Sequence, residues 1–216
     1  MSSFVRPPID APVFRDAEGQ VIEYGNRWRG SPPEETYSVD THPERFAPLH
    51  AVADALIAHL LDTYDAELME GPETAADLLH PIPEVIRAVR IRPNDPACAG
   101  LTFVFTTYPG IVLHAGLLHD FHYPGCGCDA CDSTWEAEAD ELERHVLAVV
   151  GGNYRESIDR GLRQWVEYVL DYPDGAWSSG RSRARDIPAE RVRAATGVLR
   201  NRSEAWAPWP TAASDA

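Results

Sequence analysis

The chain has 216 residues, of which 44% are hydrophobic and 25% charged, a composition typical of a globular domain that buries a sizeable core. No apolar run approaches the ~20 residues that a membrane span needs, and the N-terminus lacks the pattern of a secretory signal, so we expect a cytoplasmic protein. The formal net charge of −15 argues against general binding to nucleic acid, whose phosphates require a basic surface.

The charge is unevenly distributed along the chain. All 19 basic residues are arginine, and seven of them lie in residues 181–216 with four acidic residues, so this segment carries +3 and residues 1–180 carry −18. Arg181, Arg183 and Arg185 would share one face of an extended segment, where they could bind an anion or pair with an acidic helix. We favour the pairing because the chain is acidic overall.

The N-terminal third predicts an arm, a hairpin and a long helix. Residues 1–11 are rich in proline and predict an irregular arm, and residues 12–25 contain two short β-prone runs around a glycine turn. Residues 41–68 begin with Thr41 and Glu44, which form the pattern of a capping box. The apolar residues that follow recur at helical spacing: Phe46, Leu49, Ala53, Leu56, Ile57, Leu60, Leu61 and Tyr64.

The middle of the chain predicts an antiparallel sheet, because β-branched and aromatic runs alternate there with turn residues. A tight turn at 108–110 would pair the two runs beside it, with Leu101 opposite Leu118. That register places the 94–100 loop at the same end of the sheet as residues 116–119. The predicted strands are 85–91, 101–107 and 111–116.

The second half predicts another long helix and a hairpin. Ser133 and Glu136 form a second capping box, and the helix extends to about residue 149, with a possible continuation over 153–162 after two glycines. Residues 165–180 predict a hairpin around a Pro-Asp-Gly turn.

The C-terminal part predicts a short helix and a tail. The helix would cover residues 187–200, with Asp186 as its N-cap. The tail over 203–216 is expected to be mobile unless its two tryptophans dock it.

The element order lacks the regular alternation of βαβ units and predicts an α+β fold. We expect a single domain over residues 12–202, in which a mainly antiparallel sheet packs with two long helices and a short C-terminal helix. The arm over 1–11 and the tail over 203–216 flank this domain.

Three of the four cysteines lie close together. Cys126, Cys128 and Cys131 form the pattern C-x-C-x-x-C, and three thiolates in a tight loop can bind one tetrahedral Zn²⁺. Gly125 and Gly127 allow a loop to wrap around an ion, and the helix that starts after Cys131 favours thiolates at its N-terminus. The pattern therefore predicts a structural zinc site.

A closed zinc site needs a fourth ligand, and three residues are candidates. His122 lies four residues before Cys126 and is the first choice, while the expected register would also bring Cys98 or His119 to the cluster. His145 lies roughly 18 Å along the helix from its start and is out of reach.

Other chemistry was weighed for the same cluster. Zinc ranks first among the possible ligands, above an iron–sulfur cluster. A redox or reactive-thiol role ranks below a metal site, at the same level as a cluster without any role. The zinc-deaminase signature fails because Gly116 stands where the glutamate after His114 is needed. His114, Asp120 and Asp129 are candidates for an acid–base group, although packing and capping explain them more simply.

These observations favour a non-enzymatic protein with a structural zinc site and a possible protein partner. The alternative is a metal- or thiol-dependent enzyme that uses the same cluster with an open coordination position.

Five stretches resemble one known family: "RPPIDAPVFRDAEGQVIEYGNRW", "YSVDTHPERFAPLHAVADALIAHL", "LTFVFTTYPGIVLHAG", "CGCDACD" and "VLAVVGGNYRES". They are similar to an uncharacterised actinobacterial family of unknown function, and the similarity covers about residues 6–180. The lysine-free composition agrees with such a source. The resemblance implies no activity, so function must be argued from the residues.

Overall fold

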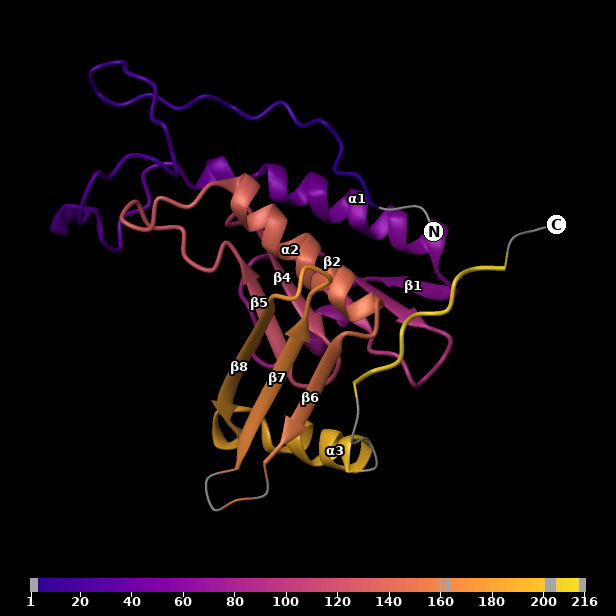
Figure 1. The fold of residues 1–216 in the computed structure, drawn as a ribbon. Helices are drawn as coiled ribbons and strands as arrows, with labels where there is room; N and C mark the ends of the chain where they lie inside the picture. Colours follow the sequence, from indigo (N-terminus) through magenta and orange to yellow (C-terminus); the bar gives the residue numbers. More distant parts are fainter. Residues whose placement is uncertain (1–3, 160, 162–163, 201–204, 214–216) are drawn as a thin grey trace.

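The computed structural model describes residues 4–159, 161, 164–200 and 205–213. The chain folds into two antiparallel sheets, one of five strands and one of three, with two long helices and one shorter helix (Figure 1). The predicted α+β fold is confirmed.

The larger sheet is a meander in which each strand pairs with the next one in the sequence, in the order β1-β2-β3-β4-β5. Every residue of the two strands β3 and β4 is buried, because both faces of the sheet are covered there. The strands are β1 (Ala66–Glu70), β2 (Val85–Pro93), β3 (Leu101–Thr106), β4 (Gly110–Ala115) and β5 (His119–Tyr123).

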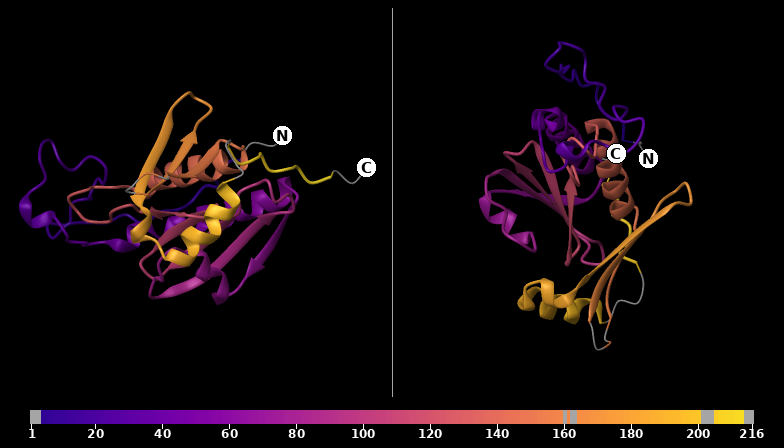
Figure 2. Two further views of the ribbon diagram at one scale, coloured as in Figure 1. Left: turned by 90° about the horizontal axis from the view of Figure 1, so that it is seen from below. Right: turned by 90° about the vertical axis from the view of Figure 1, so that its left-hand side faces the viewer.

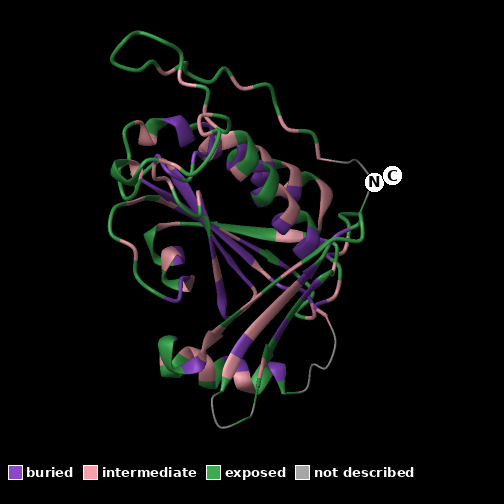
Figure 3. Ribbon diagram, turned by 60° about the vertical axis from the view of Figure 1, so that its left-hand side comes forward, coloured by how far each residue is buried: buried purple, intermediate pink, exposed green. Residues whose placement is uncertain are grey.

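Two helices of 16 residues, α1 (Pro48–Thr63) and α2 (Trp135–Val150), lie side by side over one face of this sheet (Figures 1 and 2). Their apolar faces and the sheet face between them form the main core, seen as the buried centre of Figure 3. The opposite face carries a smaller apolar cluster of four buried residues, which packs beside the 3₁₀ helix η3 (Pro72–Asp77): Leu78, Ala88, Val104 and Val112.

The smaller sheet contributes to the same main core. Its strands are β6 (Tyr154–Ile158), β7 (Trp165–Asp171) and β8 (Trp177–Arg183), with β7 in the middle. Tyr154 is fully buried, and α3 (Ala189–Leu199) packs beside β6. The predicted hairpin over 165–180 is confirmed as β7 and β8.

The helix starts differ from the predicted caps. Thr41 caps no helix, because a 3₁₀ helix, η2 (Pro43–Phe46), precedes α1, and the Thr41 hydroxyl instead donates to Asp129. The N-cap of α2 is Thr134, whose side chain accepts from the Ala137 amide. The final helix starts after Pro188 without a side-chain cap.

Three strands were not predicted from the sequence. Residues 66–70 continue the predicted first helix in pattern but form β1, residues 119–123 form β5, and residues 154–158 form β6 rather than a helical continuation. The register between β3 and β4 also differs from the prediction, since Leu101 lies opposite Ala115 and not Leu118. The turn comprises residues 107–109, since Thr106 pairs with Gly110, and the partner of Leu101 shifts by three residues.

The described part of the C-terminal tail is docked. Trp206 and Trp209 are buried, with 5% and 4% of their surface exposed. The amide of Trp206 donates to Tyr154 O and that of Trp209 to Val150 O, both at 2.9 Å. The expected mobility of the tail was conditional on its tryptophans not docking, and in residues 205–213 the two tryptophans do anchor the chain.

The N-terminal arm lies against the helices. Arg6 forms ion pairs with Asp140 and Glu143 of α2, and the Phe4 ring packs edge-on against His59 of α1. The predicted hairpin after the arm is reduced to one isolated bridge, between residues 15 and 21.

The arginine-rich run does not pair with the acidic helix. Arg181 and Arg183 instead stack on the Trp165 ring, and Arg185 lies 3.6 Å from Asp186.

Candidate metal centre

The loop between β5 and α2 brings the three cysteine sulfurs together. The Sγ atoms of Cys126 and Cys128 are 3.4 Å apart, as are those of Cys128 and Cys131. All three sulfurs lie within 4.8 Å of one another. The loop therefore gathers the three sulfurs around one point, and we call this arrangement the three-sulfur cup.

The cup has the dimensions of a metal site. A tetrahedral ion with Zn–S distances of about 2.3 Å separates its sulfurs by about 3.8 Å, so a small opening of the cup would admit an ion. Cys126 and Cys131 are exposed, and Cys128 is half-buried. The residues present therefore fit a metal held by three thiolates, with one side of the ion facing solvent.

Hydrogen bonds within the cup favour a thiolate at its centre. The Cys131 amide donates to the sulfur of Cys128, and the neighbouring thiols and the Ser38 amide add to this effect, which lowers the pKa of Cys128 to about 7. The neighbouring sulfurs of Cys126 and Cys128 raise the pKa of Cys131 to about 12. The cup thus favours one thiolate with two neighbouring thiols. A soft cation that bound there would displace the remaining thiol protons.

Backbone hydrogen bonds fasten the loop to the N-terminal segment. The Asp129 amide donates to Val39 O at 2.7 Å, and the Ala130 amide donates to Thr36 O at 3.0 Å. Figure 1 shows the two segments lying together at one end of the molecule, away from β1. The loop is thus held by residues about 90 positions earlier in the chain.

Two buried aspartates reinforce this attachment. Asp132 accepts from the Arg27 Nε at 2.5 Å, and the second guanidinium nitrogen lies 3.8 Å from Asp129. Thr41 also donates to Asp129. Arg45, with 3% of its side chain exposed, lies 3.9 Å from the same carboxylate. Since a buried carboxylate needs such partners, these contacts fix the loop in one conformation.

Gly127 is needed because another side chain occupies the space beside it. A Cβ at this position would lie 1.7 Å from the hydroxyl oxygen of Tyr108. That hydroxyl donates to Asp40 at 3.0 Å, and the guanidinium of Arg45 donates to the Gly127 carbonyl at 2.5 Å. The glycine therefore permits a close approach, in addition to the loop flexibility inferred from the sequence.

Most of these supporting residues carry no spacing signal in the sequence. Arg27, Arg45 and Tyr108 lie in unrelated segments, and only the fold brings them to the loop. A partial signal lies in the two aspartates of "CGCDACD": from the sequence, Asp129 is interpreted only as an acid–base or capping group, and Asp132 has no assigned role.

His122 lies apart from the sulfur cup. It is exposed and pairs with Val112, so it faces the side of the sheet opposite to Phe121 and Tyr123. It lines a separate hollow that includes Glu84. Among the described residues, the group whose ligand atoms lie within 4.8 Å of one another contains the three sulfurs alone.

Cys98 and His119 lie at the other end of the sheet. His119 pairs with Ala115, whereas Tyr123, which leads into the loop, pairs with Ile111 four residues away, or roughly 13 Å along the strand. Cys98 is buried, and its sulfur donates to the Pro208 carbonyl. The expected meeting of the cluster with this end of the sheet is wrong, because the unpredicted strand β5 carries the chain back to the opposite end.

The expected acid–base trio is only partly assembled. His114 and Asp120 are hydrogen-bonded, with Nδ1 and Oδ1 2.6 Å apart, whereas Asp129 belongs to the loop described above. His145 lies in the core, where its Nδ1 contacts the Tyr123 hydroxyl.

Comparison with known proteins places the chain in a family. None of the helices in the described residues is long and apolar enough to cross a membrane. No curated protein and no solved structure matches the chain. The model of a family of unknown function, DUF6226, matches residues 10–213, and the chain therefore belongs to this family.

Proposed function

We propose that the loop binds one zinc ion through Cys126, Cys128 and Cys131. The observation that carries this proposal is the three-sulfur cup, whose sulfurs already lie near the separations of a zinc thiolate site. Three thiolates select a soft or borderline cation over Mg²⁺ or Ca²⁺, which prefer oxygen ligands. A cytoplasmic location is part of the proposal, because thiols remain reduced there.

The ion would act as a structural clamp. Its loop contacts the 36–41 segment on one side and leads directly into α2 on the other. Closing the cup would therefore hold the N-terminal segment, the loop and the helix start as one unit. We propose that this unit serves to bind a protein partner, and that the exposed side of the ion is part of the binding surface.

The fourth ligand remains a point to test. His122, proposed from the sequence, would have to leave its position on β5 to reach the sulfurs, whereas water or a partner side chain could approach from solvent. His122→Ala separates the two: unchanged zinc affinity assigns the fourth position to an external ligand, and a loss of at least tenfold assigns it to His122.

A metal- or thiol-dependent enzyme is the second candidate. It is favoured by the exposure of Cys126 and Cys131 and by the lowered pKa of Cys128, which are properties of a reactive rather than a sealed site. An open coordination position would then bind and polarise a substrate.

Cys128→Ser distinguishes a structural role from a catalytic one, with Cys98→Ser as the matched control. A structural site predicts that Cys128→Ser loses both zinc and cooperative unfolding of the protein, while Cys98→Ser, whose hydroxyl can still donate to Pro208 O, keeps both. Loss of zinc with an unchanged unfolding transition would overturn the structural role and favour the enzyme. Full zinc content in Cys128→Ser would overturn the assignment of this ligand.

A further inference from the structure

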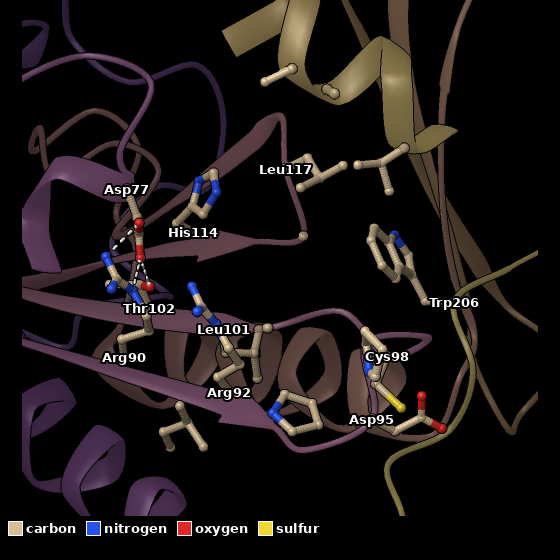
Figure 4. A pocket seen from close by; sticks show the side chains of 18 of the residues that line it. Asp77, Arg90, Arg92, Asp95, Cys98, Leu101, Thr102, His114, Leu117 and Trp206 are labelled. Carbon is tan, nitrogen blue, oxygen red and sulfur yellow. Dashed lines mark hydrogen bonds and ion pairs between the residues drawn. The ribbon is translucent and has the colours of Figure 1, made fainter. Parts of the chain in front are cut away.

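A cavity of about 580 Å³ lies on the other side of the molecule from the cysteine loop, between the sheet and α3. Its walls come from β2, β3 and β4, from the turn after β4 and from one side of α3. This volume falls within the range of small-molecule sites. Figure 4 shows His114 and Arg92 toward one end of the cavity and Leu117 and Trp206 toward the other.

His114 is oriented by its neighbours. Its Nδ1 lies 2.6 Å from Asp120, whose other oxygen accepts from the Leu79 amide at 2.8 Å. Its Nε2 lies 3.4 Å from a guanidinium nitrogen of Arg191, which can only donate. The proton is therefore assigned to Nδ1, and Nε2 carries a lone pair at the polar end of the cavity.

The three arginines that line the cavity differ in their partners. Arg90 is neutralised by a two-point contact with Asp77, which also accepts from Thr102. Arg191 donates to the main-chain carbonyl of Asp77 at 2.5 Å and to that of Ala76 at 3.4 Å. It forms no ion pair with a carboxylate of the described residues. The side chain of Arg92 makes no hydrogen bond or ion pair with any described residue, and it extends toward the same space as His114 (Figure 4).

Among the described residues, the guanidinium groups of Arg92 and Arg191 thus have no carboxylate partner, in a chain whose net charge is −15. The remaining acidic residue of the lining, Asp95, lies at the end away from His114, beside Cys98 (Figure 4), and its carboxylate accepts from the Ala97 amide. Charge of one sign in a hollow with apolar walls attracts a small anion. The acidity of the rest of the chain favours a single negative charge over a phosphate dianion.

The apolar side of the cavity indicates what the anion is attached to. Leu117, Ala194 and Val198 line this side, and Val198 is 45% exposed at the rim. An apolar body of a few carbon atoms or one ring would cover these side chains and remove them from water.

We propose that this cavity binds a small organic monocarboxylate. Its carboxylate lies between Arg92 and Arg191, the side chains that can donate to it. Its apolar body packs against Leu117 and Val198. On binding, the carboxylate draws the Arg191 donor away from Nε2 of His114, and a hydroxyl group next to the carboxylate donates to Nε2 in its place, so hydroxy acids bind more tightly than acids without that group.

Four probes of similar size test the proposed ligand class by titration calorimetry at low salt. The proposal predicts that mandelate binds, that phenylacetate binds more weakly because it lacks the hydroxyl, and that uncharged mandelamide binds at least tenfold more weakly than mandelate. Phenyl phosphate is expected to bind no better than phenylacetate. Equal binding of mandelamide, tighter binding of phenyl phosphate or no binding of either carboxylate would each overturn the proposal.

Variants place the binding in this cavity. Arg92→Gln should weaken mandelate binding about tenfold. Arg193→Gln, the matched control, removes an exposed arginine of α3 that lies outside the cavity lining and should leave binding unchanged. His114→Gln should reduce the preference for mandelate over phenylacetate. Binding that is unaffected by Arg92→Gln, or weakened equally by Arg193→Gln, would show that the carboxylate binds elsewhere or without a specific site.

Discussion

At the scale of single residues, the cysteine loop depends on side chains outside it. Arg27 contacts both buried aspartates of the loop, and Arg45 contacts one of them and the Gly127 carbonyl. The guanidinium groups also stack on the Tyr24 ring. A loop of small residues has little core of its own, so these contacts and the proposed ion must define its shape.

Gly127→Ala tests this dependence. The added methyl group would collide with the Tyr108 hydroxyl, so we expect the free energy of unfolding to fall by about 1–3 kcal/mol and zinc affinity to fall with it. Gly125→Ala is the control in the same loop, because a Cβ there meets only the His122 carbonyl at 3.8 Å, an ordinary contact. Urea unfolding and a zinc competition assay measure the two effects. Equal behaviour of the two variants would contradict the packing described here.

His145 makes stability depend on pH. Burial, with a smaller contribution from the Arg144 charge, lowers the pKa of His145 to about 4 in the folded chain, against about 6.5 for an unperturbed histidine. The unfolded chain therefore binds a proton first as the pH falls. Stability from this group is complete above about pH 6.5 and decreases toward pH 4, by up to about 1.4 kcal/mol per pH unit.

Urea unfolding of variants at pH 7 and pH 5 measures this contribution. His145→Gln should lose less stability than the native protein between the two pH values, whereas His80→Gln, which changes an exposed histidine, should show the native difference. An unchanged difference in His145→Gln would mean that this histidine is not the group responsible.

At the scale of elements, the C-terminal segment shows how tertiary contacts replace regular structure. Residues 205–213 form isolated bridges at residues 207 and 211 and donate amide hydrogen bonds to three separate parts of the chain. The indole nitrogen of Trp209 donates to Ala99 O at 2.8 Å, and its ring packs edge-on against Tyr64. The segment therefore closes the core between α1 and the sheet.

Trp209→Ala should remove this closure. Loss of a buried indole and its hydrogen bond is expected to cost about 3–5 kcal/mol of unfolding free energy. Trp177→Ala is the control, since Trp177 is 68% exposed, and its effect should stay within about 0.5 kcal/mol. Chemical denaturation followed by circular dichroism compares the two variants. A small effect of Trp209→Ala would show that the segment is not part of the folded core.

The elements that were predicted correctly are those with a strong local pattern. The apolar residues of α1 and α2 recur at helical spacing, and β3 and β4 contain runs of β-branched, aromatic and other apolar residues. By contrast, β5 reads His-Asp-Phe-His-Tyr and β1 reads Ala-Glu-Leu-Met-Glu, and neither sequence favours a strand by itself. Pairing with a neighbouring strand decides their conformation, which no local pattern records.

The same limit applies to the candidate site. The spacing of the cysteines was sufficient to predict that three sulfurs meet, because all lie in one short loop. His122 was inferred as the fourth ligand from its nearness in sequence. Cys98 and His119 were inferred from the position of the loop relative to the sheet, and one unpredicted strand, β5, changes that position. The cavity residues Arg92 and Arg191 lie about 100 positions apart, so only the folded chain brings them together.

At the scale of the whole molecule, the two sheets and three helices share one main core, and the proposed metal loop lies at its edge. The cysteine loop and the cavity beside α3 lie at different places on this body, so zinc binding and carboxylate binding can be tested separately. The loop joins the N-terminal segment to α2. The proposed ion would hold the loop in one conformation in a region where few apolar side chains pack.

Metal analysis combined with thiol counting tests the central claim most directly. The account predicts about one zinc ion per chain in protein purified without chelator, and no thiol that reacts rapidly with a thiol reagent. After chelation, three thiols should react rapidly, because Cys126 and Cys131 are exposed and Cys128 is half-buried, whereas Cys98 is buried and should react slowly. Protein that contains no metal and has three rapidly reacting thiols, and that takes up no zinc when it is added, would contradict the account.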